Sequence, residues 1–189
     1  MVDKQWEFTG ETKIRFGITL KRIRAAVGFR LKCGIVISKG ELGGWIEKES
    51  NLSDNAWVYD NACVSGNARV YGNARVCGNA RVSGNACVYG NAWVSGDARV
   101  SGNAWVSGDA CVYGNARVES PKDYCVYKNT WSSFRWFTYT RSNKMWKAGC
   151  FHGTGAELIA KAYKDSEKSG KCYEAVVKAQ EEIEKVMEV

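Results

Sequence analysis

Hydrophobic and polar positions alternate with a six-residue period through the middle of the chain. From Asn55 to Ser120, eleven consecutive units have Asn or Asp, then Ala, a variable residue, Val and a variable residue, and nine of the eleven close with Gly. The Ala and the Val are two positions apart, so both lie on one face of a short strand and the variable residues lie on the other. The junction between Gly and Asn is typical of a tight turn. The pattern predicts eleven short strands, each followed by a corner.

A six-residue period is the signature of a parallel β-helix, a solenoid in which each coil packs on the next. Three units close one triangular coil, so eleven units predict about 3.7 coils, on the order of 18 Å at about 4.8 Å per coil. The array resembles the left-handed β-helix of hexapeptide-repeat proteins, in which a small residue follows an aliphatic one four places later, as Ala62 follows Val58. The handedness is what this resemblance implies. A degenerate first coil keeps the apolar fourth place at Ile46 and Leu52.

The outward side chains form ladders, because units three apart lie on the same side of the triangle. The arginine face carries Trp45, Cys63, Arg81, Arg99 and Arg117; the tryptophan face carries Trp57, Arg75, Trp93 and Cys111, beside Tyr59 and Tyr113; the tyrosine face carries Arg69, Cys87 and Trp105, beside Tyr71 and Tyr89. Like charges stacked on the arginine face are unfavourable, so an acidic partner or nucleic acid, or else splayed solvated side chains, must offset them. The aromatic side chains of the other two faces predict a contact surface, either with another protein or within the trimer that the resemblance implies.

Segments of a different character flank the coil, and they divide the chain into residues 1–42, 43–120 and 121–189. The first segment predicts a strand-rich cap with approximate alternation, and the last predicts a small α+β module of a β-hairpin and two helices. The predicted strands are Ile14–Phe16, Leu20–Arg24 and Phe29–Lys32 in the cap, and Tyr124–Tyr127, Phe134–Thr140 and Lys144–Cys150 in the module. A capping box at Thr154 predicts the start of the first helix, and Ser169-Gly170 predicts its end. The fold class is therefore mainly β.

Net positive charge lies mainly in the segments at the two ends of the chain, with +3 in residues 1–54, +1 in residues 55–120 and +3 in residues 121–189. The stretch from Thr12 to Gly40 has eight Lys and Arg and no acid, in a chain of net charge +7. Such a run predicts contact with nucleic acid or an acidic protein, or a solvated outer sheet face. The candidate binding residues are Arg81, Arg99, Arg117, Arg15, Lys21, Arg22 and Arg24.

Residues that support catalysis or metal binding are scarce. Left-handed β-helix acyltransferases need a His base at the interface between coils, and this coil has neither a His nor an inserted loop. The one His of the chain, His152, lies two residues from Cys150, without a third orienting group nearby, so a structural role is predicted for both. No pair of residues has zinc-ligand spacing. We expect no catalytic residue, no cofactor and no metal.

Eight cysteines do not predict disulfides in this chain. The coil cysteines lie on different faces or about 9.6 Å apart, whereas bridged Cα atoms lie within about 7 Å. The sequence shows no apolar segment of the length that a signal peptide or membrane span requires. We therefore expect a reduced, cytoplasmic protein with no membrane contact.

Three parts of the chain resemble one family. The segment Ile37–Glu47, the repeat array, and Phe137–Tyr139 followed by Gly149–Thr154 are similar to bacteriophage and prophage hexapeptide-repeat proteins with their C-terminal module. The resemblance implies a phage or mobile-element origin, a bacterial host cell and a role in countering host defence. We expect a non-enzymatic protein that inhibits a host defence or nucleic-acid-handling protein through its basic and aromatic surface. A polymer-forming or virion component is the alternative, and an acyltransferase is a second one.

Overall fold

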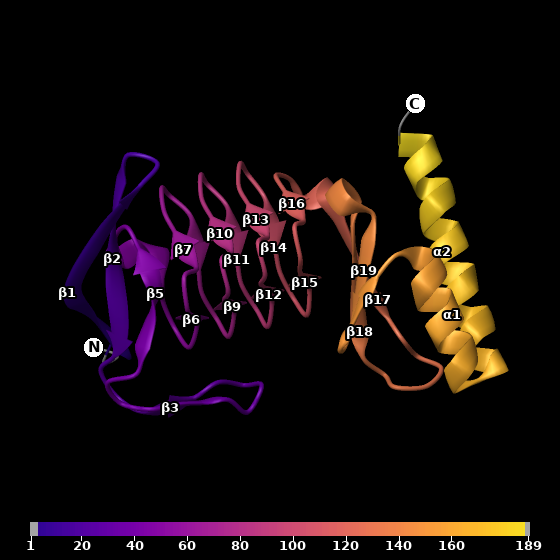
Figure 1. Cartoon of the computed structure of the whole chain (residues 1–189), viewed down its shortest axis with the longest axis horizontal. Helices are drawn as coiled ribbons and strands as arrows, with labels where there is room; N and C mark the ends of the chain where they lie inside the picture. The colour runs from indigo at the N-terminus through magenta and orange to yellow at the C-terminus, as the bar shows by residue number, and fades with distance from the viewer. Residues whose placement is uncertain (1–3, 188–189) are drawn as a thin grey trace.

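The structure is a computed structural model that describes residues 4–187. It is mainly β and has three parts in a row along its long axis (Figure 1). An N-terminal hairpin and arm lie at one end, the coil occupies the middle, and a second sheet with two helices lies at the other end. No helix within residues 4–187 has the length and apolar character needed to cross a membrane.

The coil is a β-solenoid of parallel strands arranged as the sequence predicts. The strands are β5 (Leu42–Ile46), β7 (Cys63–Val64), β10 (Arg81–Val82), β13 (Arg99–Val100) and β16 (Arg117–Val118) on the arginine face; β6 (Trp57–Val58), β9 (Arg75–Val76), β12 (Trp93–Val94) and β15 (Cys111–Val112) on the tryptophan face; and β8 (Arg69–Val70), β11 (Cys87–Val88) and β14 (Trp105–Val106) on the tyrosine face. Residues 18 apart pair in every sheet, as Arg81 does with Arg99 and Cys87 with Trp105. The ladders predicted from the six-residue period are therefore confirmed.

Small and aliphatic side chains fill the inside of the triangle. All eleven Ala and all eleven Val of the array are at most 1% exposed, and they form one continuous core cluster. Backbone N–H groups donate to carbonyl oxygens one coil further on, as Arg81 N does to Ala98 O at 2.9 Å. The degenerate coil joins the same ladders, since Trp45 pairs with Cys63 and Leu52 with Val70.

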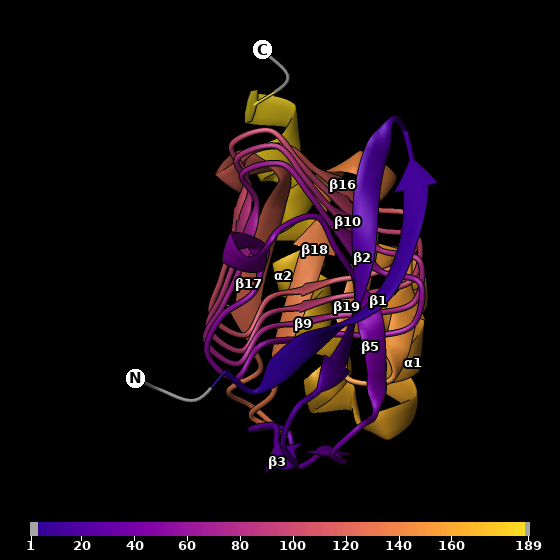
Figure 2. The ribbon, with the colours of Figure 1, turned by 90° about the vertical axis from the view of Figure 1, so that its left-hand side faces the viewer.

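The N-terminal cap extends one sheet of the coil. Strands β1 (Trp6–Arg15) and β2 (Ile18–Ala25) form an antiparallel hairpin, and β2 pairs with β5, which gives a seven-stranded sheet in the order β1-β2-β5-β7-β10-β13-β16. Figure 2 views this end and shows the hairpin in front of the coil, lying across its N-terminal end. The next strands, β3 (Phe29–Arg30) and β4 (Val36–Ile37), form a small arm. The cap is therefore rich in strands.

Carboxylates close the corners of the first coil. The pairs, from acceptor oxygen to Gly N–H donor, are Glu47 with Gly66 at 2.6 Å, Asp54 with Gly72 at 2.9 Å and Asp60 with Gly78 at 3.1 Å. Asp54 and Asp60 take the left-handed backbone conformation, with φ of 55° and 52°, that Gly takes in later coils. This geometry explains why Asp60 replaces Gly in the repeat: the residue keeps the corner and adds an acceptor.

The C-terminal module closes the other end of the coil with three hydroxyl groups, one on each face. Cys111 N donates to Thr138 Oγ1 at 2.9 Å, Arg117 N donates to Ser142 Oγ at 2.7 Å, and Ser107 N donates to Tyr124 Oη at 3.3 Å. These N–H groups belong to, or directly follow, the last strand of each face, so no further coil offers them a carbonyl oxygen as acceptor. The module therefore satisfies donors that a longer solenoid would pair with its next coil.

The module itself has more strands than predicted. Strands β17 (Tyr124–Lys128), β18 (Trp136–Thr140), β19 (Met145–Ala148) and β20 (Phe151–Gly153) form a four-stranded antiparallel sheet rather than a hairpin. Helices α1 (Gly155–Asp165) and α2 (Glu167–Met187) follow it. The capping box is confirmed, because Thr154 Oγ1 accepts a hydrogen bond from Glu157 N and the Glu157 carboxylate accepts one from Thr154 N.

The predicted helix break at Ser169-Gly170 is wrong. Helix α1 ends at Asp165, the extended Ser166 separates the helices, and Gly170 lies inside α2. A Cβ at Gly170 would lie 2.3 Å from the ring of Tyr163. The glycine therefore allows close packing of the two helices instead of ending one.

Candidate functional site: the arginine groove

A groove runs between the β1–β2 hairpin and the arginine face, and it is the candidate functional site. We call it the arginine groove; its volume is about 320 Å³. It is lined by Arg15, Phe16, Ile18, Leu20, Cys63, Ser65, Arg81, Ser83, Arg99 and Ser101. Three guanidinium groups and no carboxylate thus surround a partly apolar floor. The groove joins Arg15 of the cap to Arg81 and Arg99 of the coil, which the sequence alone does not bring together.

The hairpin turn places an aromatic ring over the arginine ladder. Phe16 and Gly17 connect β1 to β2 with φ of 53° and 75°, so both turn residues have positive φ, as in a type I′ hairpin turn. That turn favours Asn or Gly, and a bulky residue at positive φ is strained. Phe16 is nevertheless 73% exposed, and the guanidinium carbon of Arg81 lies 4.5 Å from its ring centroid.

The positive charges of the groove have no carboxylate partner. Within residues 4–187, no ion pair involves Arg15, Arg81, Arg99 or Arg117. Arg15 donates only to the sulfur of Cys63, at 3.5 Å. Burial, followed by the charges of Arg15 and Arg99, lowers the pKa of Arg81. An anion in the groove would relieve this electrostatic stress.

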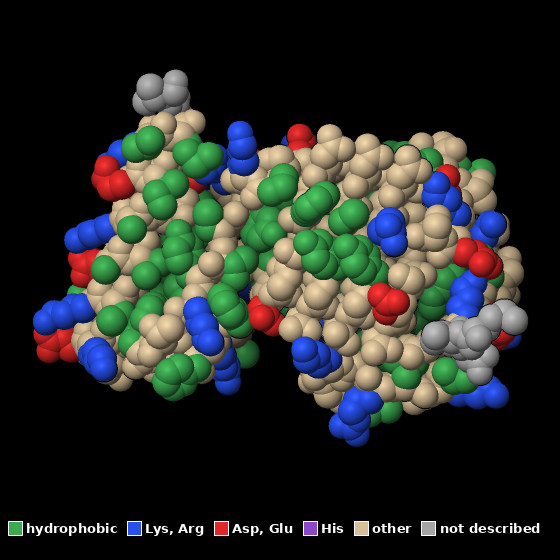
Figure 3. Space-filling model, turned by 180° about the vertical axis from the view of Figure 1, so that it is seen from behind, with side chains coloured by type: hydrophobic (Ala, Val, Ile, Leu, Met, Phe, Trp, Pro, Cys, Tyr) green, Lys and Arg blue, Asp and Glu red, His purple; other side chains and the backbone are tan. Residues whose placement is uncertain are grey.

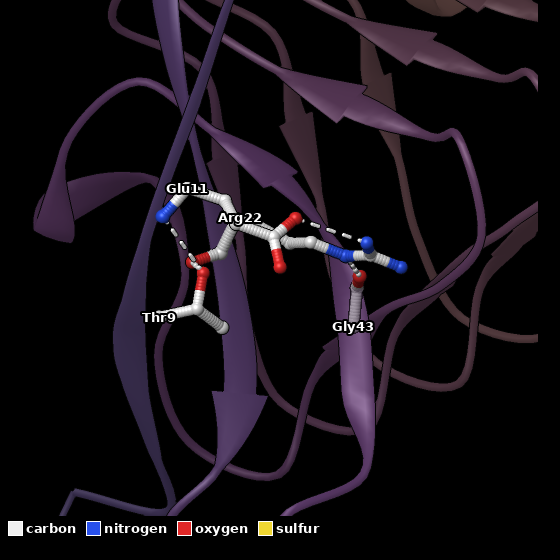
Figure 4. A network of polar contacts seen from close by, with 4 residues as sticks. All are labelled: Thr9, Glu11, Arg22 and Gly43. Carbon is white, nitrogen blue, oxygen red and sulfur yellow. Dashed lines mark hydrogen bonds and ion pairs between the residues drawn. The ribbon is translucent and has the colours of Figure 1, made fainter.

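The other basic candidates of the cap are partly neutralised by the hairpin. Arg22 donates to the Glu11 carboxylate at 3.1 Å and to Gly43 O at 3.4 Å (Figure 4). Arg24 donates to the carboxylate of Glu7, its cross-strand partner, at 2.7 Å. Lys21 is exposed, with its ammonium 5.2 Å from the ring of Phe8. The acids of β1 precede the basic run in sequence, and only the hairpin register brings them beside it.

The tryptophan face is not the exposed aromatic stripe that the sequence predicts. Trp57 is 0% exposed, because Phe29 of the arm packs edge-on against it with a centroid distance of 5.5 Å. Tyr59 lies edge-on to Trp57, and burial raises the pKa of its hydroxyl. The interface role predicted for Trp57 is therefore wrong: the chain's own arm covers it.

The C-terminal module covers the other end of the tryptophan face. Tyr113 packs edge-on against His152 with centroids 4.9 Å apart, and the Lys147 ammonium lies 4.3 Å from the Tyr113 ring. Trp93 is half-buried and donates to the sulfur of Cys77 at 3.0 Å. Tyr113 and Trp93 thus contribute to contacts within the chain.

The tyrosine face keeps its aromatic side chains accessible. Tyr71 and Tyr89 stack with centroids 5.0 Å apart and an interplanar angle of 3°, and Trp105 is 57% exposed. Figure 3, which shows the molecule from behind, has hydrophobic side chains gathered over the middle of the coil. The candidate interface residues Tyr71, Tyr89 and Trp105 therefore remain on an open face.

His152 occupies a packing position, and most of the cysteines are buried or half-buried, within residues 4–187. His152 and Cys150 share no hydrogen bond within residues 4–187, and Nε2 of His152 is buried against the coil. Across the described part of the chain, no three His, Cys, Asp or Glu side chains are placed to hold a metal ion. The eight cysteines are free thiols. His152 instead packs on Gly114, where a Cβ would lie 2.8 Å from its ring.

Stability is expected to depend on pH through His152. Burial, followed by the charge of Lys147, lowers its pKa below the ordinary 6.5, so the unfolded chain binds this proton more readily than the folded protein. The stabilisation from neutral His152 is therefore present above pH 6.5 and is lost as pH falls toward the lowered pKa. Thermal unfolding between about pH 7.5 and about pH 5 measures this, and His152→Gln is expected to flatten the dependence. Equal slopes for both proteins would contradict it.

The repeats of the coil match a known family model. Residues 62–78, 68–81, 74–90, 80–96 and 92–108 match the family described as YdcK Beta solenoid repeat. No curated protein matches the chain. Together with the three parallel sheets, the matches identify a repeat β-solenoid protein.

Proposed function

We propose that this protein is a non-enzymatic binding protein that holds an acidic partner in the arginine groove. The supporting observation is the stack of Arg81, Arg99 and Arg117 on consecutive coils, without any ion-pair partner within residues 4–187. The three side chains start about 4.8 Å apart, a spacing at which like charges repel. A bound acidic surface removes that repulsion. Arg81 and Arg99 line the groove and Arg15 adds a third charge there from the hairpin, whereas Arg117 lies one coil beyond the lining residues.

The closed ends of the coil favour a discrete binding body over a filament. Strand β2 pairs with β5 at the start of the arginine face, and module hydroxyls accept hydrogen bonds from one N–H group on each face at the other end, so both ends carry caps that hinder end-to-end stacking. The tyrosine face is the open aromatic surface available for self-association, and we assign it the interface of a homotrimer. Size-exclusion chromatography with light scattering tests this; a monomer would remove the trimer.

The phage resemblance extends the proposal to inhibition of a host protein. The resembling segment Ile37–Glu47 runs from the end of the arm through β5, the first strand of the arginine face, and Gly149–Thr154 lies in the module, so the two segments lie at opposite ends of the coil. A rigid coil with one basic groove can bind an acidic or phosphate-bearing surface of a host protein. It would then compete with the host protein's own ligand for that surface. Competition between this protein and a nucleic-acid substrate for such a host protein would measure that role.

The triple variant Arg81→Glu/Arg99→Glu/Arg117→Glu is expected to lose binding to polyanions. We expect at least about a hundred-fold weaker binding of poly-glutamate and of a short single-stranded oligonucleotide at moderate salt, because reversed charges repel the ligand. Fluorescence anisotropy across a salt series measures this. The unmodified protein should bind more weakly as salt rises.

Lys122→Glu/Lys164→Glu/Lys168→Glu is the matched control. These lysines are exposed, lie outside the arginine groove and give the same change in net charge. The control should retain most of the binding. Equal losses in the two triple variants would show that net charge alone drives binding and would remove the groove from the proposal. Circular dichroism verifies that both variants keep the fold.

A further inference from the structure

The arginine groove repeats one guanidinium and one hydroxyl on successive coils. Arg81 and Ser83 form one rung and Arg99 and Ser101 form the next, with the rungs about 4.8 Å apart. Each Arg lies two residues from its Ser, so both side chains point to the same outer side of the coil. A ligand that follows the rungs meets an anion-binding pair at each step.

Glutamates bound this row of hydroxyls at both ends. The outward fifth places of the face are Glu47, Ser65, Ser83, Ser101 and Glu119, and backbone hydrogen bonds such as Ser83 N to Val100 O keep them in one ladder. Carboxylates repel an anion, so the favourable stretch covers the three serines, of which Ser83 and Ser101 also lie beside an arginine. This length matches a few consecutive anionic groups of a ligand, and phosphate suits it because a guanidinium group and a hydroxyl can both donate to phosphate oxygens.

The hairpin adds an exposed aromatic ring beside the Arg–Ser pairs. Phe16 is 73% exposed although its φ of 53° is unfavourable for a bulky residue, and Arg81 lies against its ring. Strain of this kind persists where the surrounding structure holds it, and it gathers at binding sites. Ile18 and Leu20 line the groove beside the ring. An acidic peptide needs the charges only, whereas a flat base also uses the ring.

We propose that the arginine groove binds a nucleotide unit, with its phosphates on the Arg81–Ser83 and Arg99–Ser101 rungs and its base stacked on Phe16. This inference rests on the proposed function, because the same arginines attract the ligand. Stacking of bases on aromatic side chains combined with a basic track is how proteins bind single strands without reading their sequence. A free nucleotide and one unit of a single strand present the same chemistry to the groove.

Phe16→Leu tests the proposal, and Phe134→Leu is its matched control. Phe134 is also exposed, at 67%, and also has a positive φ of 55°, but it lies in the C-terminal module outside the groove. Anisotropy or calorimetry should show about five-fold to about a hundred-fold weaker oligonucleotide binding for Phe16→Leu, and no change for Phe134→Leu. Poly-glutamate binding should be unchanged in both variants. Phe16→Tyr should keep nucleotide affinity.

The outcomes separate this inference from the proposed function. Equal oligonucleotide affinity for Phe16→Leu and Phe134→Leu would overturn the nucleotide site. If the triple arginine variant still lost poly-glutamate binding, the acidic-partner proposal would stand. If the triple arginine variant bound both probes normally, both proposals would fail. Comparing a nucleoside diphosphate with the oligonucleotide shows whether the natural ligand is a free nucleotide or a unit of a single strand. The site is supported if either probe binds tightly and Phe16→Leu weakens that binding. Inorganic phosphate bound as tightly as both would overturn it.

Discussion

Trp57→Ala is expected to destabilise the protein by about 3–5 kcal/mol, the range for removing a large buried aromatic side chain. Trp57 is 0% exposed and packs between Phe29 of the arm and Tyr59 of the coil. Removing the indole leaves a cavity under the arm, and the contact that holds the arm is lost. Denaturant unfolding measures the change in the free energy of unfolding.

Trp105→Ala is the matched control, measured at protein concentrations low enough to keep the chain monomeric, because Trp105 occupies the same third place of its repeat but is 57% exposed. Its loss should change stability by about 0.5 kcal/mol or less. Trp57→Phe adds a second check: it keeps a ring and removes the indole N–H, which is buried without a hydrogen-bond partner. Similar losses for Trp57→Ala and Trp105→Ala would mean that the arm does not cover the tryptophan face in solution.

Thr138→Val is expected to weaken the junction between the module and the coil by about 1–3 kcal/mol, the cost of leaving a buried N–H without an acceptor. Thr138 is 1% exposed, and its hydroxyl accepts from Cys111 N at 2.9 Å. Valine keeps the shape of the side chain but cannot accept this bond. The free energy of unfolding and the hydrogen-exchange rate of the Cys111 amide measure the effect.

Ser142→Ala is the matched control for this junction. Its hydroxyl accepts from Arg117 N at 2.7 Å, but the bond is exposed, so water can replace it. We expect a clearly smaller loss than for Thr138→Val. If the two variants lose the same stability, or if the Cys111 amide exchanges no faster in Thr138→Val, the module does not close the coil through these hydroxyls.

The parts of the fold that follow from the repeat were predictable from the sequence. The six-residue period determines which residues share a face, so the sequence alone predicts that Arg81 pairs with Arg99 and Cys87 with Trp105. Inside and outside also follow, because Ala and Val occupy fixed places in each unit. Local turn chemistry explains the corners in the same way.

Long-range contacts of non-repeating segments were not predictable in this way. The third place of the repeat predicts an outward side chain for Trp57, but the repeat cannot tell that Phe29 covers it. The basic run likewise gives no sign that Glu7 and Glu11 of the preceding strand meet Arg24 and Arg22. The two acids of β1 lie four residues apart and the two arginines of β2 lie two apart, and only the register irregularity between Phe8 and Thr12 brings both pairs together.

The arginine groove was half predictable. The stacked arginines follow from the period, whereas Arg15 and Phe16 join them only because a two-residue turn folds the hairpin beside β7 and β10. Phe-Gly is an unusual sequence for such a turn, so the sequence-based strand prediction ran through Phe16. The strained residue is where local sequence rules and the structure disagree, and it is also where the ligand is proposed to bind.

The 18-residue coil sets the distance between the hairpin and the module, and this distance can change only by whole coils if their relative orientation is kept. Duplicating one coil within the array would move the hairpin and the module about 4.8 Å further apart, keep both on the same sides and add one rung to the groove. Duplicating a single six-residue unit would instead turn the module by one third of a revolution about the long axis. Gene variants that differ by repeat number can therefore change the reach and the relative orientation of the two ends independently of either end's sequence.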